Sequence, residues 1–166
     1  MTMKPGHKPI AVFAVVLLAL AGLLLADSPA EPEKFAPGII STDGFELGLS
    51  FSPDGHTAYF SQIGEGFKTS VIVYSHFENG QWTQPRPISS GGPYRDLDVF
   101  LCPDGKKMFF QSDRPVEGTE AKDWDIWVSK KTPTGWSEPR NLGAPINTPA
   151  TETFPVVTAD GTLYFR

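Results

Sequence analysis

An internal repeat constrains the fold of this chain more than any other feature. Three segments align on an Asp-Gly turn, each with an acid eight residues before the turn aspartate and an aromatic pair after it: residues 46–61, 96–112 and 152–166. The turn aspartates Asp54, Asp104 and Asp160 are 50 and 56 residues apart. Self-similarity at such a period is typical of architectures in which one small supersecondary unit is stacked several times.

The second half of the unit also recurs. Residues 71–74 correspond to residues 125–128, and the pattern Trp-[Thr/Ser]-[Gln/Glu]-Pro-Arg occurs at 82–86 and again at 136–140, 54 residues later. Agreement at this many positions is improbable by chance. The whole unit is therefore duplicated, and not only its turn.

Each unit is predicted to form four short antiparallel strands. Leu47, Leu49 and Phe51 alternate with small or polar residues, which is the period-2 pattern of a strand with one apolar face. A Pro-Asp-Gly turn then closes a hairpin, because proline presets its backbone angle and glycine accepts a positive φ. The pattern predicts further strands at 58–61, 71–75 and from Trp82, and in the second unit at 97–101, 108–111, 125–129 and from Trp136. The residues of the structural repeat motif are Pro53, Asp54, Gly55, Pro103, Asp104, Gly105, Asp160, Gly161, Trp82 and Trp136.

The composition agrees with many short strands. The 166 residues include 16 Gly and 16 Pro, and only 20% are charged, which argues against a coiled coil or a helical bundle. Four strands in a unit of about 50 residues is the period expected of β-propeller blades. The predicted fold class is therefore all-β, with two full four-stranded blades and a partial third in an open arc.

At these residues the chain resembles a known repeat family. The Phe51-Ser52-Pro53-Asp54-Gly55 turn, the Tyr59-Phe60 pair, and the segments 125–128 and 135–139 look like the exported TolB-like, WD-repeat-like β-propeller repeat. The resemblance covers residues 46–166. It implies a β-propeller that takes part in protein–protein interaction in the cell envelope, but it does not define the ligand, because propellers serve many unrelated functions.

The first 26 residues have the layout of a secretory signal peptide. Lys4 and Lys8 precede residues 10–26, which carry no charge, and a polar stretch containing proline follows. An uncleaved membrane anchor is the alternative, because 17 apolar residues are at the lower limit of spanning length. Both interpretations predict an N-terminal helix. Both also place the rest of the chain outside the cytoplasm, either free in the periplasm or extracellular space or anchored to the membrane.

The remaining length predicts an incomplete propeller. Residues 27–45 are expected to be a linker, in which 36–45 supply an outer strand that completes another blade. The repeats then follow as 46–95, 96–151 and a partial 152–166, which is fewer than the four to eight blades that close a propeller. The chain is therefore expected to be part of a longer protein or to self-associate through its open blade edges.

Charge and residue types exclude several classes of partner and chemistry. Without Lys4 and Lys8 the chain has 12 basic and 19 acidic residues, a net charge of −7, which argues against nucleic acid as a partner. The single cysteine, Cys102, predicts no internal disulfide. His56 and His76 have no further ligand at metal spacing, and no Gly-x-Ser-x-Gly motif occurs, so no metal, cofactor or catalytic activity is expected.

Five residues are candidates for binding. Glu46, Asp96 and Glu152 begin the first strand of each unit, which lines the central channel of a propeller. They either form an acidic rim for a cation, a basic peptide or sugar hydroxyls, or accept structural hydrogen bonds. Arg114 either pairs with an acid of an adjacent blade or binds a ligand. Trp124, at the end of a long charged loop, is the best candidate for an exposed aromatic contact.

The predicted function is an exported β-propeller module that binds or scaffolds. It would recognise a protein or a glycan in the cell envelope without catalysis, and the membrane would be involved only through an uncleaved N-terminal segment. The alternative is the N-terminal propeller of a larger hydrolase, either a prolyl-oligopeptidase-like peptidase or a glycan-processing enzyme. A hydrolase domain encoded downstream would favour the alternative, and further blades alone would favour the first interpretation.

Overall fold

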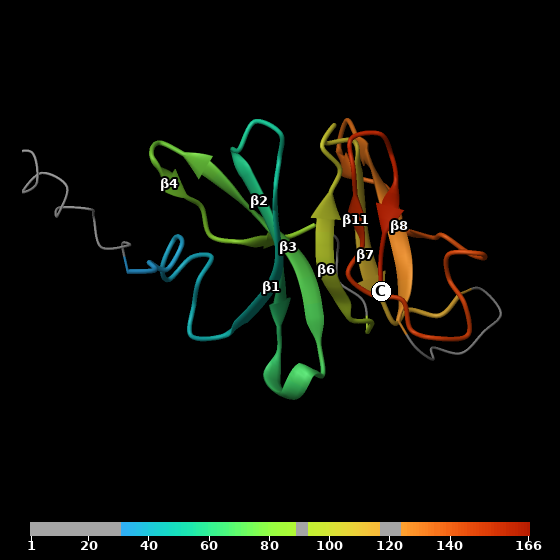
Figure 1. Ribbon diagram of the computed structural model, residues 1–166. Helices are drawn as coiled ribbons and strands as arrows, with labels where there is room; N and C mark the ends of the chain where they lie inside the picture. Colours follow the sequence, from blue (N-terminus) through green and yellow to red (C-terminus); the bar gives the residue numbers. More distant parts are fainter. Residues whose placement is uncertain (1–30, 89–92, 117–123) are drawn as a thin grey trace, which may run out of the picture. The chain divides into compact units, whose positions relative to one another are not determined.

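The computed structural model describes residues 31–88, 93–116 and 124–166, which form an almost entirely β structure (Figure 1). All strands of the described residues belong to one compact unit, Lys34–Arg166. The predicted signal or anchor segment and its helix, residues 1–26, lie outside the described residues. Within the described part of the chain, no helix combines the length and apolar character needed to cross a membrane.

The first sheet is antiparallel and contains the first repeat. Its strands are β1 (Phe45–Phe51), β2 (Thr57–Ile63), β3 (Ser70–Glu78), β4 (Gln81–Trp82) and β5 (Arg86–Pro87). They follow the order β1-β2-β3-β4, and β5 also pairs with β3. The short 3-10 helix η1 (Glu65–Phe67) joins β2 to β3.

The second sheet has the same topology. Its strands are β6 (Asp96–Leu101), β7 (Lys107–Ser112), β8 (Asp125–Thr132), β9 (Gly135–Trp136) and β10 (Arg140–Asn141), in the order β6-β7-β8-β10 with β9 also on β8. The third repeat forms a two-stranded sheet of β11 (Val156–Val157) and β12 (Leu163–Tyr164). These curled antiparallel sheets are blade-like, so the predicted all-β class is confirmed.

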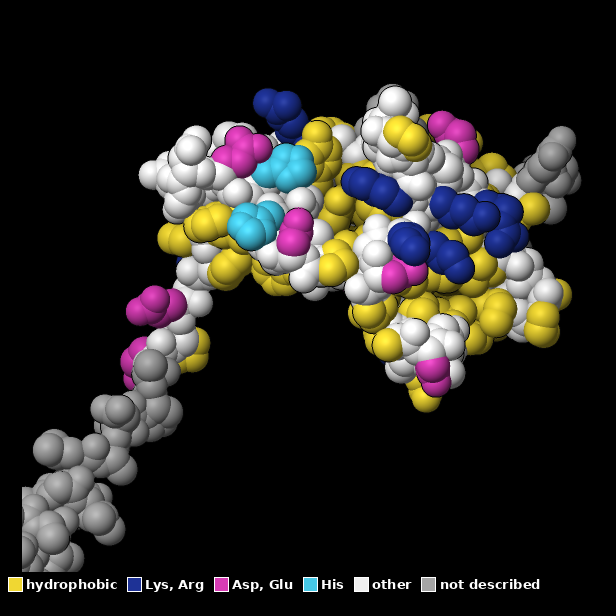
Figure 2. All heavy atoms as spheres, turned by 90° about the horizontal axis from the view of Figure 1, so that it is seen from above, with side chains coloured by type: hydrophobic (Ala, Val, Ile, Leu, Met, Phe, Trp, Pro, Cys, Tyr) yellow, Lys and Arg dark blue, Asp and Glu magenta, His cyan; other side chains and the backbone are white. Residues whose placement is uncertain are grey.

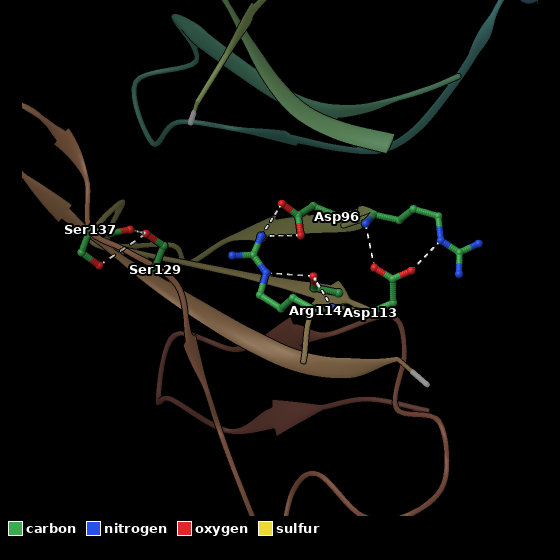
Figure 3. Close-up of polar contacts among 7 residues, drawn as sticks. Asp96, Asp113, Arg114, Ser129 and Ser137 are labelled. Carbon is green, nitrogen blue, oxygen red and sulfur yellow. Dashed lines mark hydrogen bonds and ion pairs between the residues drawn. The ribbon is translucent and has the colours of Figure 1, made fainter. Parts of the chain in front are cut away.

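The fourth strand of each unit differs from the prediction, because it is divided into two short pieces. Between the pieces the sequence is Thr-Gln-Pro or Ser-Glu-Pro, and proline has no N–H for a strand ladder. Side chains replace the missing ladder bonds. The Ser75 hydroxyl donates to the Thr83 carbonyl, and the Ser129 hydroxyl donates to the Ser137 carbonyl at the equivalent position (Figure 3).

The turn aspartates have the structural role that the repeat predicts. The carboxylates of Asp54, Asp104 and Asp160 each accept a hydrogen bond from the backbone N–H two residues later, at 3.0, 2.9 and 3.2 Å. Hydroxyl groups of Ser52 and Thr158 also donate to the first and third of these carboxylates, and these bonds lower the pKa of Asp54 and Asp160. The glycine that follows each aspartate has a positive φ.

The two large sheets share one hydrophobic core. The first sheet contributes Tyr59 and Ile72, and the second contributes residues of β6, β7 and β8: Val99, Leu101, Met108, Phe110 and Trp127. Trp136 packs against this core, with its ring 5.8 Å from the ring of Tyr59. The second repeat tryptophan of the W-x-x-P-R pattern therefore joins the two sheets, as expected for neighbouring blades.

Residues 36–44 do not form a strand in this structure. They make turns and one isolated bridge between Pro37 and Ser41. Ile40 is buried against Phe60 and Val73 of the first sheet, so the segment covers that sheet instead of extending it. That this segment completes another blade stays a prediction.

A left-handed residue interrupts β1 and β6, and the equivalent residue of the third unit, which precedes β11, has the same conformation. Gly48, Asp98 and Phe154 each stand two residues after the strand's acid, and they have φ values of 64, 51 and 54°. The pairing register shifts at this point in both large sheets, which is a β-bulge. A Cβ atom on Gly48 would lie only 2.6 Å from the Asp98 Cα, so β1 and β6 are in backbone contact here.

Replacing Asp98 with asparagine is expected to stabilise the protein at neutral pH. Burial raises the pKa of the Asp98 carboxyl above its ordinary value of 3.8, because the ionised form is poorly solvated in the folded state. Ionised Asp98 therefore destabilises the fold above its raised pKa, and this effect disappears below 3.8, where both states are protonated. In urea unfolding over a range of pH, the stability difference between D98N and the parent should grow as pH rises. A stability difference that stays constant with pH would mean that burial does not raise the pKa of the Asp98 carboxyl.

Candidate functional site

Glu46 and Glu152 each accept hydrogen bonds from a threonine four residues earlier in the chain. Glu46 accepts hydrogen bonds from the Thr42 backbone N–H, at 3.3 Å, and from the Thr42 hydroxyl. Glu152 makes the same pair of bonds with Thr148, with the N–H at 3.1 Å, and it is 4% exposed. The sequence shows this spacing in both units, because each glutamate follows a threonine by four residues. Aligning the units on their Asp-Gly turns did not identify it.

Asp96 is held by an ion pair instead. Arg114 Nη2 lies 2.7 and 2.6 Å from the two Asp96 carboxylate oxygens, and Arg114 Nε donates to the buried Ser112 hydroxyl at 3.0 Å (Figure 3). The guanidinium also lies 5.3 Å from the Trp127 ring centre. The expectation that Arg114 pairs with an adjacent blade is wrong. The β6–β7 register places Asp96 opposite Ser112, so the acid of the same repeat is nearest.

Trp124 is half-buried, and its predicted role as an exposed aromatic contact remains a prediction. The Arg95 guanidinium lies over its ring at 4.6 Å, and Arg95 Nε also bonds to the Asp113 carboxylate at 2.7 Å (Figure 3). The Trp124 carbonyl accepts the Glu152 backbone N–H at 2.8 Å. Most of the preceding charged loop, residues 117–123, lies outside the described residues.

A pocket of about 430 Å³ lies where β1 and β6 begin. Its polar lining comes from hydroxyl, amide and carboxyl side chains: Thr42, Thr69, Ser70, Tyr94, Gln62, Glu46 and Asp96. Two of the three predicted acids, Glu46 and Asp96, are therefore brought together here. The third acid, Glu152, is not part of this lining, and neither are Arg114 and Trp124.

Two features of the pocket are available to a ligand, an unpaired hydroxyl group and an exposed aromatic pair. The Ser70 hydroxyl is buried without a hydrogen-bond partner among the described residues. Phe45, which lines the pocket, is 67% exposed and lies 6.1 Å from the exposed ring of Phe67 in η1. The site thus offers an unsatisfied polar group beside an exposed aromatic pair, a combination that suits ligand binding.

Sequence reasoning missed most of this lining. Gln62, Ser70 and Tyr94 come from the end of β2, the start of β3 and the segment before β6, and none of them belongs to the repeated motif. Only the β2–β3 register and the contact of β1 with β6 bring them near Glu46. No sequence spacing would have selected them.

The remaining reactive groups do not gather in the part of the chain that the structure describes. Within residues 31–88, 93–116 and 124–166, no three His, Cys, Asp or Glu side chains are arranged to hold a metal ion. Cys102 is buried, and burial raises the pKa of its thiol. A raised thiol pKa disfavours the nucleophilic thiolate.

Comparison with models of known protein families found no match, and comparison with curated proteins found none. The resemblance to the TolB-like repeat therefore rests on the motifs of the chain itself. The blade-like sheets and the pocket between the starts of β1 and β6 carry the functional argument.

Proposed function

We propose that this chain is an exported β-propeller module of the cell envelope, related to TolB-like repeats, that binds a glycan or a protein segment without catalysis. The two large sheets support a propeller, because they have equivalent topology, share one core and contact each other through their first strands. In that arrangement the third repeat begins another blade.

The pocket at the starts of β1 and β6 carries this proposal. Its lining is mostly hydroxyl, amide and carboxyl groups, and the exposed rings of Phe45 and Phe67 stand beside it. A short neutral glycan matches this chemistry best. Its hydroxyls both donate and accept hydrogen bonds, so one would satisfy Ser70, and its apolar ring face would pack on an aromatic side chain.

The hydrogen bonds that the pocket carboxylates already make favour ligand binding over glycoside hydrolysis. Glycoside hydrolysis needs one carboxyl group that donates a proton and a second that acts as base or nucleophile. Both Asp96 oxygens already accept hydrogen bonds from Arg114, and both Glu46 oxygens accept bonds from Thr42. These carboxylates therefore stabilise the lining of the pocket.

A disaccharide titration followed by amide NMR tests the proposal. Maltose, cellobiose and chitobiose would be compared with the peptide acetyl-Gly-Lys-Gly-amide. A disaccharide is expected to shift the amide signals of Thr69, Ser70 and Val71. Ser70→Ala should weaken its binding about fivefold to tenfold, the effect of one lost hydrogen bond.

Ser61→Ala is the matched control. Ser61 is also buried on the β2–β3 pair without a hydrogen-bond partner among the described residues, but it does not line the pocket. Its removal should change the affinity less than twofold. Equal losses of affinity in Ser70→Ala and Ser61→Ala would contradict the proposed binding site. If the peptide binds and the disaccharides do not, the ligand of the pocket is a protein segment and not a glycan.

A further inference from the structure

Four lysines form one corner of the second sheet, at the end away from the pocket. We call Lys106, Lys107, Lys130 and Lys131 the lysine corner; all four are exposed. Lys107 lies directly opposite Lys130 in the β7–β8 pair, and the Lys131 backbone N–H donates to the Lys106 carbonyl at 2.8 Å. Figure 2 shows Lys and Arg side chains gathered over this end of the protein.

The first sheet has the same corner without lysines. His56, Thr57, His76 and Phe77 are the equivalent residues. Phe77 N–H donates to the His56 carbonyl at 2.8 Å, and Thr57 lies opposite His76. There the facing side chains hydrogen-bond, since Thr57 Oγ1 lies 3.0 Å from His76 Nδ1. The fold therefore builds this corner without lysine, so packing does not explain the four lysines.

The lysine corner is electrostatically unfavourable for the protein alone. Like charges directly opposite each other on paired strands are destabilising. Of the ion pairs between described residues, none includes these four lysines. Asp104 belongs to the adjacent turn, but its carboxylate accepts the Lys106 backbone N–H at 2.9 Å. Four of the chain's 14 basic residues thus lie together in a protein of net charge −5.

We propose that the lysine corner binds a linear anionic polysaccharide. Lysine acts as a point charge without the planar fork of arginine, which suits repeated charges on a polymer more than one oriented group. A pocket of about 380 Å³ is lined by Lys107 together with residues of the turns at Asp104 and Gly161, and one sugar unit of the polymer could occupy it.

The directions of the lysines favour a polymer over a flat bilayer. Lys107 and Lys130 share one face of the sheet by strand alternation. Lys131 lies over Trp136, 4.9 Å from its ring, and Trp136 packs toward Tyr59 on the other face. The charges therefore straddle the end of a sheet, where a chain can cross between them, and do not lie in one plane as a membrane surface would require.

This proposal does not depend on the pocket. Asp96, at the pocket, pairs with Ser112 at the far end of β7, and Lys107 begins that strand. A failure of disaccharide binding would leave the lysine corner untouched, and a failure here would leave the pocket proposal standing.

The test measures binding of the full chain to polygalacturonate, with the same polymer fully methyl-esterified as an uncharged control. Lys107→Gln together with Lys130→Gln is expected to weaken binding to polygalacturonate about tenfold or more, since half of the positive charge of the lysine corner is removed. The matched control, Lys34→Gln with Lys68→Gln, makes the same change in net charge at exposed positions outside the corner and should change affinity less than twofold. Binding should also fall as salt is raised.

Three results would overturn the proposal. They are the absence of binding to polygalacturonate, equal binding of the methyl ester, and equal losses in the two double variants. A parallel measurement uses vesicles of phosphatidylglycerol and phosphatidylcholine. If the Lys107/Lys130 variant loses vesicle binding while the parent does not bind the polymer, a bilayer replaces the polysaccharide as the partner.

Discussion

Replacing Arg114 with methionine is expected to lower the free energy of unfolding by about 3 kcal/mol, because it leaves a largely buried carboxylate without its partner. Asp96 and Arg114 have side-chain exposures of 14% and 17%, and they are 2.6 Å apart. The variant also removes the Nε donor to the buried Ser112 hydroxyl, which keeps the Arg114 backbone N–H, and the cation above Trp127. Urea unfolding followed by fluorescence measures the loss.

The exposed ion pair between Lys34 and Asp43 is the control for this prediction. Its atoms are 3.8 Å apart, and both side chains are largely in solvent. Lys34→Met should therefore change stability by only about 0.5 kcal/mol or less. Arg114→Lys keeps the charge but loses the second hydrogen bond, so its stability should fall between those of the parent and the methionine variant. If Arg114→Met costs no more than Lys34→Met, the ion pair does not hold the start of β6.

Replacing Gly48 with alanine is the second change with a large expected effect. The new Cβ would lie 2.6 Å from the Asp98 Cα and 2.9 Å from the Val99 nitrogen, and these backbone atoms cannot rotate away. Gly48 also has a φ of 64°, which disfavours any residue with a Cβ. Together the overlap and the backbone conformation should cost about 3 kcal/mol in urea unfolding.

Gly80→Ala separates the two causes. Gly80 has a φ of 82°, but a Cβ there would meet no atom within 4 Å. This variant should lose only about 1 kcal/mol, the cost of the backbone conformation alone. The excess loss at Gly48 then measures the close approach of β1 to β6. Equal losses in the two variants would mean that the two sheets are not in backbone contact.

The repeat predicted the local structure well because each unit carries its own turn and its own period-2 pattern. The Asp54 and Asp104 turns and the strands around them follow from residues within one hairpin. The division of the fourth strand was only partly foreseeable. The proline indicated an outer edge, but the serine hydroxyls that replace ladder bonds depend on the register between strands.

The candidate site was less predictable for a physical reason. The partner of Arg114 is decided by which residue the β6–β7 register places opposite Ser112, and the sequence alone does not fix that register. Asp98 and Phe154 adopt positive φ values, which their side chains disfavour, so local propensity argues against the bulge that tertiary contact imposes.

The central claim is that the two blade-like sheets pack through their first strands, because this contact forms the pocket and underlies the proposal of a propeller. The most direct measurement is the nuclear Overhauser effect between a Gly48 Hα and the Val99 amide proton. The structure predicts a strong effect, since a Cβ on Gly48 would lie only 2.9 Å from the Val99 nitrogen. Gly48 contacts confined to β1 and β2, with no effect to Val99, would contradict the packing and the site built on it.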